Sequence, residues 1–83
     1  METYVIAFES THAAMATERA LACVKTTMLP TPKGISAGCG ISLKFSAETD
    51  EAAVDIARSS ADARGLASLY RQTGGSFDLV AML

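Results

Sequence analysis

The residue with the clearest capacity for chemistry is a cysteine that stands between two glycines, in Gly38-Cys39-Gly40. A cysteine reacts as its thiolate, so nearby positive charge or a helix N-terminus makes it more reactive. The flanking glycines leave the sulfur uncovered and let the backbone approach a ligand or adopt positive φ. This setting favours chemistry over packing for Cys39, although a free cysteine can also be buried as a small hydrophobic residue.

A few polar residues could support this thiol or bind an anion beside it: Ser10, Thr11, His12 and Lys33. His12 and Lys33 could supply positive charge or a proton acceptor, and Ser10 or Thr11 could cap a helix whose free N–H groups favour an anion. Each also has a plainer interpretation, as a helix cap, an ordinary helix residue or a solvated charge. No third residue that would orient a Cys–His pair is evident, and phosphate-loop and dinucleotide motifs are missing. Hydrolysis is therefore only weakly supported, and the residues favour a binding module over a turnover enzyme.

The composition describes a small domain without an obvious charged partner. The 83 residues carry 7 basic and 9 acidic side chains, for a net charge of -2, and the charges are interspersed. General nucleic-acid binding needs a basic footprint, and a membrane span needs a long apolar run, so we expect neither. The start of the sequence lacks the basic region of a secretory signal, and we expect a soluble, cytoplasmic protein. Dimerisation would help so small a domain to bury more surface.

The chain has two cysteines and one histidine. These residues do not make a zinc site of ordinary spacing, so we expect no metal and no other cofactor. A reducing cytosol also argues against a structural disulfide between Cys23 and Cys39.

Four segments have the composition of β-strands. β-branched, aromatic and alternating apolar residues predict strands over residues 3–8, 25–29, 41–45 and 66–72. Pro30 and Pro32 should end the second strand, because proline cannot donate to a ladder. Gly74 and Gly75 predict a turn, and the apolar tail beyond it could add an edge strand or pack on a partner chain.

Two segments are rich in helix-forming residues, about 12–24 and about 47–63. Ser10 or Thr11 could cap the first helix, and Ser46 or Thr49 the second. The predicted core sides carry no charge: Ala13, Ala16, Ala20 and Val24 in the first helix, and Ala53, Ile56 and Ala57 in the second.

The order β-α-β-β-α-β predicts a ferredoxin-like α+β fold, with a four-stranded antiparallel sheet and two helices on one face. The C-terminal tail could extend this sheet by one strand. In this topology the first strand ends where the third begins, so the turn 9–12 should lie at the same end as Cys39. We expect a single domain over residues 1–83, with its core at about 3–72 and an apolar tail at 73–83.

Two blocks of the sequence resemble a known family. Residues 4–12, YVIAFESTH, and 30–41, PTPKGISAGCGI, resemble the putative selenium/sulfur carrier protein-like family, which comprises small bacterial domains of unknown function. The similarity extends over about residues 3–72, and the family's turn maps onto residues 10–12. The resemblance implies that Cys39 carries sulfur or selenium as a persulfide or selenopersulfide. It also implies that the partners are donor and acceptor proteins.

Three features depart from the family pattern. Gly34 stands where members usually have Glu or a similar residue, which removes a charge beside the loop. The connection from the first helix to the second strand is shorter than expected, and the tail from Thr73 onward has no recognised counterpart. None of these departures touches Cys39, but Gly34 alters the electrostatics expected around it.

Other functions stay open beside the carrier. The chain could be a small-molecule or anion-binding regulatory domain in which Cys39 only lines the site, since a fold does not decide a function. It could be a structural or interaction domain that dimerises through a sheet edge or the tail. It could also be a redox sensor, although Cys23, the second thiol, should lie away from the Cys39 loop.

Overall fold

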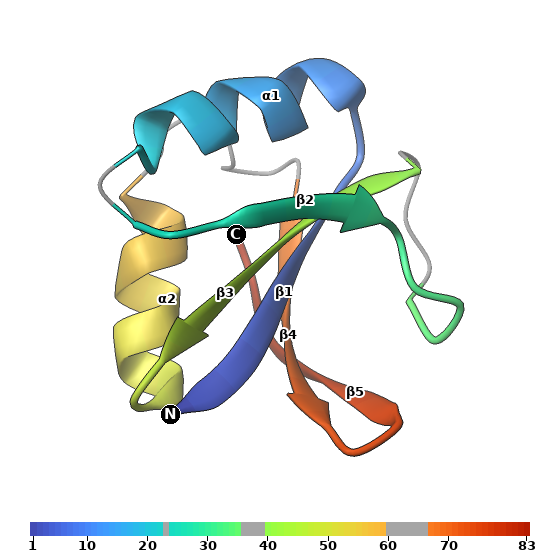
Figure 1. Ribbon diagram of the computed structural model, residues 1–83, viewed down its shortest axis with the longest axis vertical. Helices are drawn as coiled ribbons and strands as arrows, with labels where there is room; N and C mark the ends of the chain where they lie inside the picture. The colour runs from blue at the N-terminus through green and yellow to red at the C-terminus, as the bar shows by residue number, and fades with distance from the viewer. Residues whose placement is uncertain (23, 36–39, 60–66) are drawn as a thin grey trace.

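The computed structural model describes residues 1–22, 24–35, 40–59 and 67–83. Its elements, in chain order, are β1 Glu2–Phe8, α1 Thr11–Ala20, β2 Thr27–Pro30, β3 Ile41–Ala47, α2 Asp50–Arg58, β4 Ala67–Thr73 and β5 Ser76–Met82 (Figure 1). The predicted order of strands and helices is therefore confirmed.

The strands form one five-stranded antiparallel sheet in the order β2-β3-β1-β4-β5. With two helices, this confirms the predicted α+β class and its ferredoxin-like core. The extra C-terminal strand is confirmed too, because β5 pairs with β4 across the turn at Gly74 and Gly75. Gly74 has a φ of 60°, a conformation that glycine adopts without steric strain. β5 forms one edge of the sheet, and dimerisation through that edge stays a prediction.

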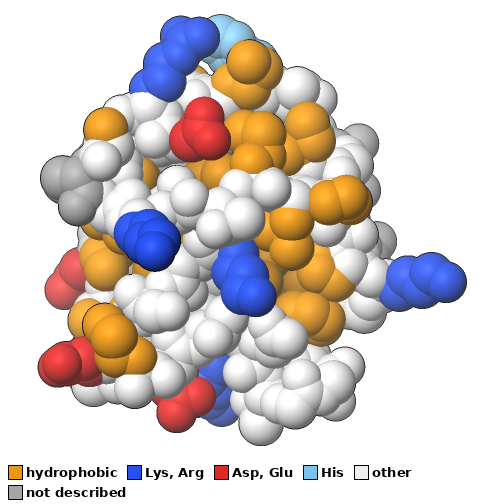
Figure 2. All heavy atoms as spheres, viewed as in Figure 1, with side chains coloured by type: hydrophobic (Ala, Val, Ile, Leu, Met, Phe, Trp, Pro, Cys, Tyr) orange, Lys and Arg blue, Asp and Glu red, His pale blue; other side chains and the backbone are white. Residues whose placement is uncertain are grey.

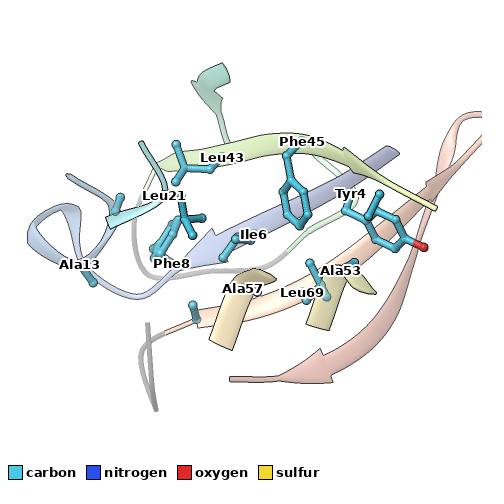
Figure 3. Packing of buried hydrophobic residues seen from close by; sticks show 13 residues of the cluster. Tyr4, Ile6, Phe8, Ala13, Leu21, Leu43, Phe45, Ala53, Ala57 and Leu69 are labelled. Carbon is cyan, nitrogen blue, oxygen red and sulfur yellow. The ribbon is translucent and has the colours of Figure 1, made fainter. Parts of the chain in front are cut away.

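Both helices pack on one face of the sheet and cover the main hydrophobic core (Figure 3). Alternate strand residues meet small helix residues there: Tyr4, Ile6, Phe8, Leu43, Phe45, Ala47, Ala67 and Leu69 from the strands, and Ala13, Ala14, Ala53 and Ala57 from the helices. The alanines let the helix backbones approach the sheet closely, so the two layers pack densely. The predicted core side of α2 is confirmed by its two buried alanines.

The opposite face of the sheet is covered at its centre by Ile35, from the segment that follows β2, and by the side chain of Phe77, from the edge strand β5. Ile35 packs there with Val5 and Ala7, and the partly buried Tyr70 and Phe77 pack against them. Antiparallel sheets commonly leave one face to solvent. In this protein the central strand β1 is instead buried on both faces.

α1 ends earlier than the sequence predicts. The helix spans Thr11–Ala20 instead of continuing to Val24, and Leu21 is its C-cap. The N–H of Leu21 still donates to the carbonyl oxygen of Thr17, at 2.9 Å. The chain then leaves the helix axis through the turn that leads to β2.

The predicted core side of α1 is only partly right. The prediction places Ala13, Ala16, Ala20 and Val24 in the core, whereas the buried residues are Ala13, Ala14 and Thr17, followed by Leu21. Val24 packs against the core from outside the helix, but Ala20 is exposed. Burying Leu21 removes more apolar area from water than burying Ala20 would, so the helix turns that side towards the sheet.

α2 begins later than predicted. Ala47, the predicted first residue, is instead the last residue of β3, where it is buried and belongs to the ladder with β1. Thr49 is the N-cap, and its Oγ1 accepts a hydrogen bond from the N–H of Ala52 at 3.0 Å. The helix ends at Arg58, and residues 60–63 of the predicted helix lie outside the described part of the chain.

β2 also lies later in the chain than the predicted 25–29. It ends with Pro30, which belongs to the ladder opposite Ile41. Proline fits at this position because β2 is an edge strand, where a missing N–H can face away from the sheet. The prediction that Pro30 ends the strand is therefore right only in the sense that Pro30 is its last residue.

A polar network joins the start of β1 to α2 and β4. The hydroxyl of Tyr4 donates to Asp50 Oδ1 at 2.6 Å, and Arg71 Nη1 donates to Asp50 Oδ2 at 2.8 Å. Nη2 of Arg71 also lies 3.9 Å from Oδ2 of Asp78 in β5. The Tyr4 ring stacks on the Phe45 ring, with 5.8 Å between the ring centroids. Burial, together with the hydrogen bond to Asp50, raises the pKa of Tyr4 to about 12. The hydrogen bond from Tyr4 is the main cause that lowers the pKa of Asp50.

Tyr4→Phe should lower the free energy of unfolding at neutral pH by about 1 kcal/mol, because it removes one hydrogen bond and keeps the ring that packs on Phe45. The raised pKa means that the stabilisation by Tyr4 is present below pH 10 and is lost as the pH rises from 10 towards 12. The lowered pKa of Asp50 means that its stabilisation is lost as the pH falls through and below 3.8. The free energy of unfolding, measured in urea from acid to alkaline pH, should fall less at both ends of the pH range in Tyr4→Phe than in wild type.

Tyr70→Phe is the matched control, because Tyr70 is the other tyrosine and lies on the opposite face of the sheet. Tyr70→Phe should lose stability at acid and alkaline pH to the same extent as wild type, because Tyr4 and Asp50 are unchanged. Identical pH profiles for Tyr4→Phe and wild type would contradict the role given to this network.

Candidate functional site

One end of the sheet gathers the places where β1 ends and where β3 and β4 begin. The register pairs Ala7 with Ser42 of β3 and Phe8 with Ala67 of β4. α1 begins at Thr11, directly after β1, so its N-terminus also starts from this end (Figure 1). We call it the loop end of the sheet, because the connection between β2 and β3 returns there.

The N-terminus of α1 is capped by Ser10. Ser10 has an extended backbone, and its Oγ accepts a hydrogen bond from the N–H of Ala13 at 3.1 Å. Its carbonyl oxygen accepts from the N–H of Ala14 at 3.2 Å. Serine is favoured at this position because its side chain satisfies one of the free N–H groups. The predicted helix cap is therefore confirmed at Ser10.

Thr11 and His12 are the first two residues of α1, and both side chains are exposed. The first turn of the helix contains no acidic residue. The positive end of the helix dipole is therefore not offset by a carboxylate from that turn. An anionic group near this end would be stabilised by the dipole.

Both stems of the connection between β2 and β3 are held by hydrogen bonds. The N–H of Thr31 donates to the carbonyl oxygen of Gly40 at 2.9 Å, which extends the ladder beyond β2. The hydroxyls of Thr31 and Ser42 lie 2.8 Å apart, and Ser42 is completely buried. On the β2 side, the N–H of Ile35 donates to the carbonyl oxygen of Pro32 at 3.1 Å. The connection thus leaves and rejoins the sheet at fixed points.

The described residues account for only part of the predicted site. Gly38 and Cys39 lie outside the described residues, as does Cys23. Gly40 is exposed, and a Cβ built on it would meet no described atom within 4 Å. Neighbouring side chains in the described part of the chain therefore do not require a glycine at position 40.

The loop end of the sheet brings Gly40 to the same end as the start of α1, with Ser10, Thr11 and His12. Lys33 is exposed in the turn that follows β2. Its role beside Cys39 stays a prediction.

The surface of the described residues offers no enclosed site. No cavity or cleft forms among them, and no three of their His, Cys, Asp or Glu side chains are placed to hold a metal ion. The basic side chains stand apart from one another on the face shown in Figure 2. Within the same residues, none of the helices has the length and apolar character needed to cross a bilayer.

Sequence reasoning missed two residues that hold the loop stems. Ser42 alternates with Ile41 and Leu43, a pattern that predicts a solvent-facing side chain, yet it is fully buried and lies within hydrogen-bonding distance of Thr31. Ile35 appears only as a loop residue, yet it is 7% exposed and belongs to the cluster on the second face. An isolated isoleucine in a Pro/Gly-rich loop was the only signal for this contact.

The fold and these loop stems define a small ferredoxin-like α+β domain whose described residues enclose no pocket. Residues 3–64 match the family described as "Putative Se/S carrier protein-like", and the chain belongs to this family. The resemblance stated for about residues 3–72 is thus confirmed in kind, with a match that ends at residue 64. The match leaves β4 and β5 outside it. Neither a curated protein nor a solved structure matches the chain.

Removal of the α1 cap should separate a structural from a chemical role of Ser10. Ser10→Ala should lower the free energy of unfolding by about 1 kcal/mol, whereas Ser10→Asp, which can also cap a helix, should keep most of it. Thr49→Ala removes the corresponding cap of α2 and is the matched control for thermal or urea unfolding. If Ser10→Ala left stability unchanged but altered the reactivity of Cys39, the capping role would be wrong.

Proposed function

We propose that the protein carries sulfur or selenium on the thiol of Cys39 and passes it from a donor protein to an acceptor protein. The observation that carries this proposal is the family match, which spans the Gly38-Cys39-Gly40 block. The fold adds support, because Gly40, the covalent neighbour of Cys39, lies at the same end of the sheet as the start of α1.

The proposed transfer needs no external oxidant or reductant. The Cys39 thiolate attacks the terminal sulfur of a persulfide on the donor, and a new S–S bond forms as the donor's S–S bond breaks. The donor cysteine leaves as a thiolate, and Cys39 now carries the persulfide. A nucleophile on the acceptor then takes the terminal sulfur, and Cys39 returns to its thiolate form. Selenium would follow the same steps as a selenopersulfide.

The described surroundings suit a carrier better than a hydrolase. A carrier must present its thiol to two partners in turn, so it benefits from an open surface, and the described residues form no cleft. The first turn of α1 has no acidic residue and the exposed His12 adds a basic group, which would both favour a thiolate nearby.

A second candidate is a regulatory domain that binds an anion or another small molecule without covalent chemistry. The same N-terminus of α1 favours it, because the positive end of a helix dipole attracts anions and the first turn of α1 contains no acidic residue. The two candidates differ in their need for sulfur at position 39. Binding that survives in Cys39→Ser would favour the regulatory domain.

The decisive experiment loads the full chain with sulfur. Wild type, Cys39→Ser and the matched control Cys23→Ser are incubated with a cysteine desulfurase and cysteine, and intact masses are measured. Wild type and Cys23→Ser should gain the mass of one sulfur atom, which reductant should remove, whereas Cys39→Ser should gain none. Absence of added sulfur in wild type, or equal loading of Cys39→Ser, would overturn the carrier role.

The reactivity of Cys39 gives an independent prediction. We expect the pKa of the Cys39 thiol to lie below the value of about 8.5 for a free cysteine, because the start of α1 favours the thiolate. Alkylation rates measured against pH in Cys23→Ser, where only Cys39 can react, would give this pKa. Slow alkylation with an ordinary pKa would indicate that Cys39 is simply a small buried side chain.

A further inference from the structure

The last strand of the sheet contacts the segment from which the Cys39 loop begins. β5 lies outside the part of the chain that matches the family, yet its residue Phe77 packs against the cluster of Val5, Ala7 and Ile35. Tyr70, from the neighbouring strand β4, completes this contact. Ile35 directly precedes residues 36–39, so the cluster holds the chain at the point where the loop leaves the sheet.

Phe77 also lies against the backbone of Gly34. A Cβ built on Gly34 would stand 3.1 Å from Cδ2 of Phe77 and 3.8 Å from Cε2. The first distance is shorter than an ordinary contact between carbon atoms, which is about 3.5–4.0 Å. A side chain at position 34 would therefore press on the aromatic ring. Glycine has no Cβ, so the ring can lie against the backbone at this position.

This contact links two features that the sequence presents separately. Gly34 lies within the part of the chain that matches the family, Phe77 lies outside it, and the two residues are far apart in the sequence. In the structure, the ring of Phe77 in the tail lies so close to Gly34 that a Cβ at position 34 would require the ring to shift by a few tenths of an ångström. The glycine and the added strand therefore form one structural unit.

We propose that Phe77 is a positioning residue for the Cys39 loop and that Gly34 provides the backbone surface on which the Phe77 ring packs. By holding Gly34 and Ile35 against the sheet, Phe77 limits the conformations available to the start of the loop. When a partner docks, less conformational entropy is lost if the segment that leads to the thiol is already fixed. The consequence for sulfur transfer depends on the proposed carrier function, but the anchor itself can be tested without it.

The test follows backbone amide exchange in the full chain. Phe77→Ala should speed exchange of the Ile35 N–H by about tenfold, which corresponds to about 1.4 kcal/mol of lost local stability. Phe77→Leu should restore much of the protection. Leu79→Ala is the matched control, because Leu79 lies on the same strand but is 57% exposed and outside the cluster. Leu79→Ala should leave the exchange rate of the Ile35 N–H unchanged.

The exchange of Ile6, in the middle of β1, separates a local from a global effect. If Phe77 positions the segment, Ile35 should respond more strongly than Ile6 does. Equal acceleration at both amides would mean that Phe77 only contributes to global stability, and unchanged exchange at Ile35 would remove the anchor altogether. Either result would overturn the proposal.

A double-mutant cycle tests the contact between Gly34 and Phe77 directly. Gly34→Ala should speed Ile35 exchange in the wild-type background, because the new Cβ displaces the ring. The same substitution should have a smaller effect in Phe77→Ala, where no ring is present. Equal effects in the two backgrounds would contradict the contact between these residues.

Sulfur loading of the same variants connects the anchor to the carrier function. The loading rate of Cys39 should fall in Phe77→Ala, recover in Phe77→Leu and stay at the wild-type value in Leu79→Ala. If wild type accepts no sulfur, the carrier role fails while the exchange results still decide on the anchor. If exchange changes as expected but loading does not, the anchor stands and its role in presenting the thiol is wrong.

Discussion

The structure depends on the burial of its central strand on both faces. Five consecutive residues of β1, Tyr4–Phe8, are each at most 3% exposed. Alternate side chains of a strand point to opposite faces, so a strand of this kind needs cover on each side. Two helices supply it on one face, whereas on the other the described residues that pack on β1 are Ile35 and the side chains of Tyr70 and Phe77 from β4 and β5. The shape of the candidate site follows from how that second face is closed.

Closure of the second face makes the base of the loop part of the hydrophobic structure. Ile35, from the segment that follows β2, packs on Val5 and Ala7 of the central strand. The hydroxyls of Thr31 and Ser42 meet beneath the same segment, so its polar groups are satisfied as well. Functional loops are often mobile at their tips and fixed at their stems by a rigid scaffold. In this chain the stems are fixed from both sides of the connection.

The sequence was sufficient for features that depend on local chemistry. The Ser10 cap, the Gly74 turn and the order of strands and helices all follow from residues close together in the chain. The orientation of α1 was harder, because alanines on several sides of the helix left the choice to Leu21, which lies beyond its end. The contact of Phe77 with Gly34 could not be found locally, since 43 positions separate the two residues. Cys39 itself was identified from its neighbours and from the family pattern, and it lies outside the described residues.

The boundary of the family match divides the chain into unequal roles. The matched part, residues 3–64, contains the thiol, both helices and the strands that flank the loop. It does not contain β4, which is the second neighbour of β1, or β5, whose Phe77 packs on the second face of the sheet. A sheet that ended at β1 would leave the backbone of its central strand unpaired along one side, so the matched part needs a further strand to be stable. In this chain, β4 and β5 meet that need, and Phe77 of β5 also contacts the segment that leads to the Cys39 loop. If Cys39 acts as proposed, the last two strands would thus support the segment from which its loop begins.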